Sequence, residues 1–279
     1  IFSALIKALL LNRKRKYDFI WSIMASFSGF SALFFKYINK QTPFVLTLQE
    51  GDSLEHIQKS FGITYPISRL LYKKIFAKAD YIQAISKFLS DYAKDMGAVC
   101  NIEVIPNAVD FKLFSSPQQQ GQIKALKSEL GIKDEENIII TTSRLVQKNA
   151  VGDIVDSMSF LPKNTKLLIL GIGSQEDFLK EKVSLLKLED RVVFAGFVPY
   201  KDIPLYLNIS HVFIRPSLSE GFGNSFIEAM ASGVPVVATR VGGIVDFLFD
   251  NQTGFFCEVK NPKSIADKVN EILSNQDLR

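Results

Sequence analysis

The sequence predicts an α/β protein with two domains, each built around a parallel β-sheet. Short apolar runs that are typical of buried strands alternate with helical segments of ~8–15 residues, which is the pattern of parallel βαβ units. The chain has 279 residues, 47% of them apolar, which is enough for two domains of ordinary size. The turn at residues 106–110 separates two such series, so we predict domains at residues 1–107 and 108–279.

In the first domain, strands are predicted at residues 17–23, 43–48, 81–85 and 102–105. Helices are predicted at about 29–39, in the segment directly after the polar loop 49–53, at about 67–77, and from the capping residue Ser86 to Gly97. The uncharged stretch 19–35 falls just short of the ~18–20 residues of a membrane span, and serines interrupt it. A strand followed by a helix is the better interpretation, with the single tryptophan, Trp21, in the core.

The second domain repeats the alternation. Strands are predicted at residues 138–142, 166–170, 192–194, 212–214 and 234–238. Helices are predicted at 122–130, 151–160, 175–186 and 201–209. A further short helix begins near Ser225, and Gly233 lies where its C-terminal cap belongs.

Cysteine and histidine are scarce, which excludes several kinds of site. Cys100 and Cys257 lie far apart and form neither a disulfide framework nor a metal-ligand spacing, which fits a reducing compartment. His56 and His211 are isolated, so neither a structural zinc site nor a serine-type triad is predicted. His211 precedes a buried strand and is expected to be structural.

The most informative segment is PSLSEGFGNSFIEAMASGVPVVAT at residues 216–239. It places two carboxylates, Glu220 and Glu228, on either side of a glycine-rich loop that opens a short helix. Gly221 and Gly223 let the backbone turn sharply and approach a ligand, and the first amides of the helix offer donors to an anion such as a diphosphate. The loop follows a strand, at the sheet edge where open α/β sheets bind ligands. Expected substrate contacts in it also include Phe222, Asn224 and Ser225.

A second interpretation of this segment needs no ligand. Ser225 and Glu228 have the spacing of a capping box, in which the glutamate only ties down its own helix. On spacing alone, the two interpretations stay open.

Arg144 and Lys148 follow the strand predicted at 138–142, so both can reach the carboxyl edge of the sheet. Arginine supplies a bidentate fork and lysine a compact charge, and both suit a diphosphate. A solvated helix start is the alternative. The pair Gly171 and Gly173, after the strand at 166–170, is a weak signal because the third glycine of a dinucleotide fingerprint is missing.

Taken together, the glutamate segment resembles the E-x7-E signature of the retaining GT-B glycosyltransferases of family 4, also named glycosyl transferases group 1. Further segments of the chain fall in that family's order: YDFIWSIM, PFVLTLQE, VIPNAVDFKLF, TTSRLVQKN, LILGIGSQED, VVFAGFVP and VGGIVDFL. The resemblance implies GT-B architecture, with two Rossmann-like domains facing a cleft, acceptor on the first and donor on the second. Family members begin with a strand and glycine-rich loop ahead of Ile1 and end with a helix that crosses back. A fragment truncated at both ends, with an incomplete first domain, is therefore expected.

The resemblance also implies roles for single residues. Glu228 is expected to hold the nucleotide ribose hydroxyls, and Glu220 to approach the donor sugar. Arg144 and Lys148 match the cations that hold the donor phosphates. The residues expected to border the nucleotide and its base are Gly171, Gly173, Phe197 and Val198.

Two positions depart from the family pattern. Gln49 stands where many relatives have a histidine that contacts the donor sugar, and a glutamine can form hydrogen bonds but cannot carry charge. Asn149 replaces the usual glycine after the lysine. Glu50, beside Gln49, is a candidate for activating an acceptor hydroxyl.

The implied activity is retaining transfer of a hexose from a nucleoside diphosphate sugar to a hydroxyl of a glycan or lipid-linked acceptor. No metal or other cofactor and no nucleic-acid partner are expected. The alternative is a non-catalytic sugar-nucleotide-binding protein on the same scaffold, because of Gln49.

The basic residues are concentrated in the first half of the chain. Residues 1–109 hold 14 Lys and Arg against 8 Asp and Glu, whereas residues 110–279 hold 19 against 21. The apolar pattern of residues 1–11 runs into the basic cluster 13–16, and it either lies on anionic lipid or packs against another part of the protein. The expected location is cytoplasmic, with peripheral contact at the inner face of the membrane.

Overall fold

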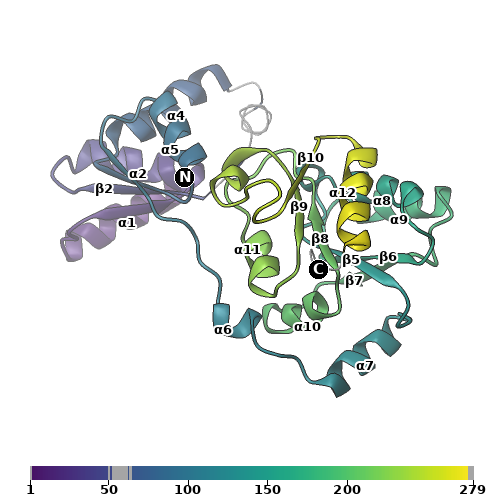
Figure 1. Ribbon diagram of the computed structural model, residues 1–279. Coiled ribbons are helices and arrows are strands. Elements are labelled where there is room, and N and C mark those ends of the chain that lie inside the picture. The colour runs from purple at the N-terminus through teal and green to yellow at the C-terminus, as the bar shows by residue number, and fades with distance from the viewer. Residues whose placement is uncertain (1, 50, 52–61, 63–64, 276–279) are drawn as a thin grey trace. The chain divides into compact units, whose positions relative to one another are not determined.

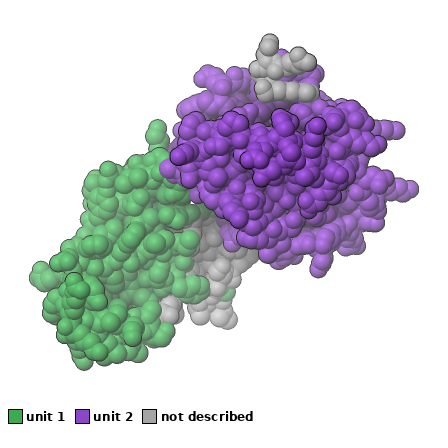
Figure 2. All heavy atoms as spheres, turned by 90° about the horizontal axis from the view of Figure 1, so that it is seen from below, with its two compact units in different colours: residues 1–107, 220–222 green, residues 108–219, 223–279 purple. Residues whose placement is uncertain are grey.

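The computed structural model describes residues 2–49, 51, 62 and 65–275. The chain divides into two compact units (Figure 2). Unit 1 comprises Ile1–Asn107 with Glu220–Phe222, and unit 2 comprises Ala108–Ser219 with Gly223–Arg279. Each unit contains one sheet whose paired strands all run parallel, so the predicted α/β class is confirmed.

Unit 1 is built on a four-stranded sheet in the order β1-β2-β3-β4. Its strands are β1 (Ile20–Ile23), β2 (Phe44–Leu48), β3 (Tyr81–Ala84) and β4 (Asn101–Val104). Its described helices are α1 (Phe2–Lys14), α2 (Phe27–Ile38), α4 (Tyr65–Lys78) and α5 (Lys87–Asp95) (Figure 1). The predicted cap is present, because the Ser86 side chain accepts a hydrogen bond from the Leu89 amide at 3.2 Å.

The prediction that Trp21 lies in the core is wrong. Trp21 is 57% exposed on the edge strand β1, and its Nε1 donates a hydrogen bond to Thr47 Oγ1 at 2.9 Å. Successive side chains of a strand point to opposite faces. In β1 it is Ser22 that is buried, while Trp21 and Ile23 face outward. Hydrophobicity alone does not say which face of an edge strand is covered.

Unit 2 is built on a six-stranded sheet in the order β10-β9-β8-β5-β6-β7. The strands are β5 (Asn137–Thr142), β6 (Thr165–Leu170), β7 (Val192–Gly196), β8 (Val212–Arg215), β9 (Val236–Thr239) and β10 (Phe255–Cys257). The order reverses between β5 and β8, which are direct neighbours although the chain passes through β6 and β7 between them. Such a reversal opens a crevice at the carboxyl ends of the strands.

Helices cover both faces of this sheet (Figure 1). One face packs against α8 (Val151–Ser157), α9 (Glu176–Leu185) and α12 (Pro262–Ser274). The other packs against α7 (Gln120–Glu129), α10 (Ile203–Asn208) and α11 (Asn224–Ala231), with the short α6 (Phe111–Phe114) beside α11. Alternate residues of β5 serve the two cores: Ile139 belongs to the first, and Ile138 and Ile140 to the second. A strand covered on both faces reads as a continuous apolar run, as this one does.

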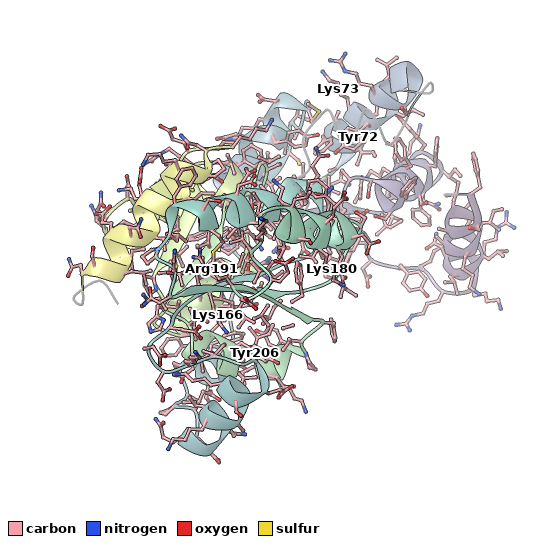
Figure 3. The ribbon with its side chains drawn as sticks, turned by 90° about the vertical axis from the view of Figure 1, so that its right-hand side faces the viewer. Tyr72, Lys73, Lys166, Lys180, Arg191 and Tyr206 are labelled. Carbon is pink, nitrogen blue, oxygen red and sulfur yellow. The ribbon has the colours of Figure 1, made fainter. Side chains whose placement is uncertain are left out.

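Side-chain hydrogen bonds join the amino ends of several strands, and one of the side chains that form them, Arg191, is labelled in Figure 3. Arg191, just before β7, donates hydrogen bonds from Nε to the Thr165 carbonyl at 3.1 Å and from Nη2 to the Pro162 carbonyl at 2.8 Å. Nδ1 of His211 accepts the Ile138 amide at 2.9 Å, next to the backbone bond from the His211 amide to the Ile138 carbonyl at 2.7 Å. His211 therefore has the structural role that we expected.

At the opposite edge, the loops after β5 and β6 lie backbone to backbone. A Cβ on Gly171 would lie 1.9 Å from the Ser143 carbonyl oxygen, and one on Gly173 would lie 2.3 Å from the Leu145 carbonyl oxygen. The Leu145 amide donates to the Ile172 carbonyl at 3.0 Å, so the two loops are also hydrogen-bonded. These glycines are needed for close packing of the two loops.

We expect Gly173→Ala to destabilise unit 2 by about 1–3 kcal/mol, because the added Cβ meets backbone atoms that cannot rotate away. Gly121→Ala is the matched control. Gly121 lies in α7 with no atom near its added Cβ, so alanine there should stabilise by up to ~1 kcal/mol. Urea unfolding followed by circular dichroism measures both changes. A Gly173→Ala midpoint equal to that of the parent protein would contradict the close packing.

Candidate functional site

The site of unit 2 is formed by three loops at the carboxyl ends of β5, β6 and β8, where the strand order reverses. Backbone hydrogen bonds join these loops. The loop after β8 is bound to the loop after β5 by the Leu218 amide, which donates to the Lys148 carbonyl at 2.7 Å. The Gln175 amide, after β6, donates to the Leu145 carbonyl at 2.9 Å. The loops therefore form one connected rim, although they come from distant parts of the sequence.

The loop after β5 carries the two predicted cations. Arg144 is exposed, and Lys148 is half-buried on the 3₁₀ turn η2 (Gln147–Asn149). Asn149 is buried, and its Nδ2 donates to the Arg144 carbonyl at 2.7 Å. Ala150 follows with φ +51°, a left-handed conformation that is uncommon for alanine. Asn149, the departure from the family glycine, thus closes the turn that presents both cations.

The helix of the glutamate segment begins earlier than the capping-box interpretation requires. Gly223, with φ +93°, is the N-cap of α11 and has no side chain with which to cap that end. Ser225 lies inside the first turn, where its Oγ accepts a hydrogen bond from Arg215 Nη1 at 2.7 Å. Glu228 is then too far along the helix to return to the N-cap amide. The capping-box interpretation is wrong.

Glu228 is a half-buried carboxylate on α11. Among the described residues, no donor forms a hydrogen bond to this carboxylate. Burial raises the pKa of Glu228, and the positive charge of Arg215 opposes that rise. A partly desolvated carboxylate without a protein donor keeps its hydrogen-bonding capacity, so it is suited to donors supplied by a ligand.

The remaining predicted residues fall in three places. Glu220, Gly221 and Phe222 group with unit 1, and the Gly221 amide donates to Glu220 Oε1 at 3.1 Å. Gln49 is exposed directly after β2 of unit 1, and Glu50 lies outside the described residues. The other predicted residues all belong to unit 2, and they are Arg144, Lys148, Gly171, Gly173, Phe197, Val198, Gly223, Asn224, Ser225 and Glu228.

The pair expected to border the base follows β7. Phe197 is 72% exposed and Val198 is half-buried, just after Gly196, whose φ is +67°. The Gly196 carbonyl accepts the Gly171 amide at 2.7 Å, which links this turn to the loop after β6. An exposed phenylalanine beside the rim is available for stacking against a flat ring.

Sequence reasoning missed Arg215. It ends β8 and is only 7% exposed, with its Cζ 4.4 Å from the centroid of the Phe226 ring. An arginine at the end of a buried apolar strand was the available signal, because a charge is rarely buried without a specific partner. Among the described residues, no group of three or more His, Cys, Asp or Glu side chains is arranged to hold a metal ion.

Two families match the chain. Residues 122–279 match glycosyl transferases group 1, and residues 1–113 match glycosyltransferase family 4. The chain is 31% identical over 180 residues to N-acetyl-alpha-D-glucosaminyl L-malate synthase of Bacillus anthracis, covering 64% of this chain and 46% of that protein. It is 29% identical over 194 residues to alpha-monoglucosyldiacylglycerol synthase of Streptococcus pneumoniae, covering 68% and 44%. The chain thus spans about half the length of these curated relatives.

Among solved structures, the chain is similar to Anabaena Alr3699/HepE, crystallised in complex with UDP-glucose. The TM-score is 0.85 at 22% identity, covering 98% of this chain and 73% of that one. At this identity the similarity shows the fold alone, and it is the GT-B fold that the sequence motifs implied. Since the group 1 family covers more than half of the chain, including the Glu220-x7-Glu228 segment, the protein belongs to the glycosyl transferases group 1, the GT-B glycosyltransferases of family 4.

Proposed function

We propose that the protein transfers a hexose from a nucleoside diphosphate sugar to a hydroxyl of a glycan or lipid-linked acceptor, with retention of configuration and without a metal. The observation that carries the proposal is Glu228, a half-buried carboxylate to which no donor among the described residues forms a hydrogen bond. It lies in the same unit as the loop of Arg144 and Lys148. Similar proteins include one crystallised with UDP-glucose and one named as a glucosyldiacylglycerol synthase.

The proposed chemistry follows from charge. Breaking the bond between the sugar and the diphosphate leaves negative charge on the leaving oxygen, while the sugar ring becomes electron-poor. Arg144 and Lys148 stabilise the leaving diphosphate, helped by the first amides of α11. Glu228 binds the ribose hydroxyls, and Glu220 approaches the sugar. The acceptor then attacks the face that the diphosphate leaves, so the product keeps the anomeric configuration of the donor.

The acceptor side of the proposal rests on unit 1. Gln49 is exposed at the carboxyl end of β2, and its amide is proposed to form hydrogen bonds with a sugar hydroxyl. Glu50 is proposed to activate the acceptor. Gln49 also favours the second candidate function, a sugar-nucleotide-binding protein that does not catalyse transfer, because glutamine lacks the charge of a protonated histidine.

We also propose a cytoplasmic location with peripheral contact at the inner face of the membrane. Phe2, Ile6 and Leu10 are exposed along one side of α1, at the spacing of successive helical turns. The cluster 13–16 supplies four basic residues at the end of this helix, which contains no acidic residue. Within the described ranges, no helix is both long and apolar enough to cross a bilayer.

The first prediction tests donor binding. Ligand-observed NMR with UDP-, GDP- and ADP-sugars should show selective binding of one donor class. Glu228→Ala should weaken this binding at least about tenfold, since hydrogen bonds to a charged group are worth about 1.5–3 kcal/mol each.

Arg144→Ala should lower turnover by roughly 10²–10³, the scale for a lost transition-state donor. Added EDTA should change neither result.

Lys124→Ala, on α7, is the matched control for both variants and should bind like the parent protein. Absence of binding to every donor, by protein shown to be folded, would overturn the proposed function. Binding without transfer to any acceptor, in a chain extended to the length of its relatives, would favour the non-catalytic alternative.

A second prediction concerns stability. Because the pKa of Glu228 is raised in the folded protein, the ionised carboxylate destabilises the fold at pH values above that pKa. Glu228→Gln should therefore raise the melting temperature at about pH 8. The gain should disappear by about pH 4, where the carboxyl is protonated in the folded state. Thermal unfolding across this range measures it, and a lower melting temperature at pH 8 would contradict the burial argument.

The membrane proposal predicts sedimentation with vesicles that contain anionic lipid and not with neutral vesicles. Binding should fall when salt rises from about 0.05 to 0.5 M, because ions screen surface charge. Lys14→Glu combined with Arg15→Glu should abolish it, whereas Lys124→Glu on α7 should not. Vesicle binding that changes neither with salt nor with the charge reversal would refute contact through α1.

A further inference from the structure

Arg215 is a buried cation that the proposed chemistry does not use. It is the last residue of β8, immediately before the loop that leads to α11. Removing a guanidinium from water is expensive, and it persists in a fold only where specific contacts compensate for the lost hydration. The contacts of Arg215 therefore indicate what the residue stabilises.

Two contacts of Arg215 fall on the first turn of α11. Nη1 donates to Ser225 Oγ at 2.7 Å, and the guanidinium lies over the Phe226 ring with Cζ 4.4 Å from its centroid. A Cβ added to Gly223 would lie 3.0 Å from Arg215 Nη2 and 2.4 Å from the Phe226 ring, so only glycine fits between them. One side chain thus contacts the N-cap residue and two residues of the first turn.

The helix needs such support. α11 has eight residues, and its N-cap, Gly223, offers no side-chain oxygen to the free amides. Helices of this length are marginal in isolation and depend on packing. Ser225 and Glu228 are three residues apart, so they lie on the same side of the helix, one turn from each other. Any displacement of the first turn is passed on to the Glu228 carboxylate.

Arg215 also acts on Glu228 through its charge. It is the group whose positive charge lowers the pKa of Glu228 against the effect of burial. Burial raises the pKa of Tyr200, on the 3₁₀ turn η4 (Tyr200–Asp202), and the negative charge of Glu228 raises it further. Asp110 and Lys112 are the charged residues at α6, the helix packed beside α11. Arg215 is thus the cation placed under the helix that carries Glu228.

We propose that Arg215 is a positioning residue: it fixes the first turn of α11 so that the Glu228 carboxylate meets the two ribose hydroxyls of the donor, without touching the donor itself. This inference rests on the proposed function, because it assumes that Glu228 binds those hydroxyls. It predicts that loss of Arg215 weakens recognition of the ribose hydroxyls more than it weakens the affinity for the diphosphate.

The test compares the affinity for UDP with that for 2′,3′-dideoxy-UDP, measured by calorimetry; GDP and its dideoxy form serve if the parent protein selects guanine. The parent protein should discriminate by roughly tenfold or more, because a charged acceptor loses two donors. Arg215→Met keeps an apolar stem under Phe226 and should reduce the discrimination to below about threefold. Arg215→Lys should restore part of it, since lysine keeps the charge but not the planar fork.

Ser225→Ala removes the hydrogen-bond acceptor without leaving an empty buried site, so it carries the test even if Arg215→Met does not fold. Its discrimination should also fall. The matched control is Arg240→Met, because Arg240 likewise stacks on a phenylalanine of unit 2, with Cζ 4.0 Å from the centroid of Phe256. This control should discriminate like the parent protein.

The outcomes separate the two levels of inference. If the folded parent protein binds none of UDP, GDP and ADP, the proposed function fails. If the parent protein discriminates and the Arg215 and Ser225 variants discriminate equally well, the positioning role is refuted while the proposed function stands. A global loss of stability would weaken the binding of UDP and of 2′,3′-dideoxy-UDP by the same factor, so the ratio of the two affinities would stay unchanged. An unchanged ratio also counts against the positioning role.

Discussion

Unit 2, the proposed donor half of the molecule, depends on a backbone-to-backbone contact at the carboxyl edge of its sheet. Gly171 and Gly173 let the loop after β6 lie directly against Ser143 and Leu145, and no side chain separates the two chains. This contact fixes the loop that presents Arg144 and, through the hydrogen bond from the Leu218 amide to the Lys148 carbonyl, the loop after β8. Since all three loops leave adjacent parallel strands, one misplaced backbone would move the whole rim.

The second determinant of the site is burial of charge. Arg215 is buried and Glu228 is half-buried, and removing either charge from water does not by itself favour the folded state. Proteins tolerate such groups where binding requires them, so binding sites are often less stable than they could be. Arg215 supports the first turn of α11, and the Glu228 carboxylate keeps its hydrogen-bonding capacity for a ligand. The proposed donor site is therefore prepared before the donor arrives.

Much of the fold was predictable because the local signals and the tertiary structure agree. Strands β5 to β9 of unit 2 are short runs of four to six residues between helices, and their length and burial on both faces favour strand over helix. The Ser86 cap follows from one side-chain oxygen. By contrast, β10, α6 and α12 were not predicted, and the predicted helix 151–160 ends as a 3₁₀ turn at Met158–Phe160. Short strands and single helical turns contain too few residues for a hydrophobic period to be recognised in the sequence.

The sequence by itself determined the α/β class, the parallel strands and the residue types at the proposed donor site, because periodicity and motif spacing are properties of the chain alone. Tertiary structure decided the rest. It exposed Trp21 on an edge strand, placed the N-cap of α11 at Gly223 rather than at Ser225, and brought Arg215 under that helix. Each of these outcomes depends on which segments pack together, and contacts between distant segments leave no local period in a sequence.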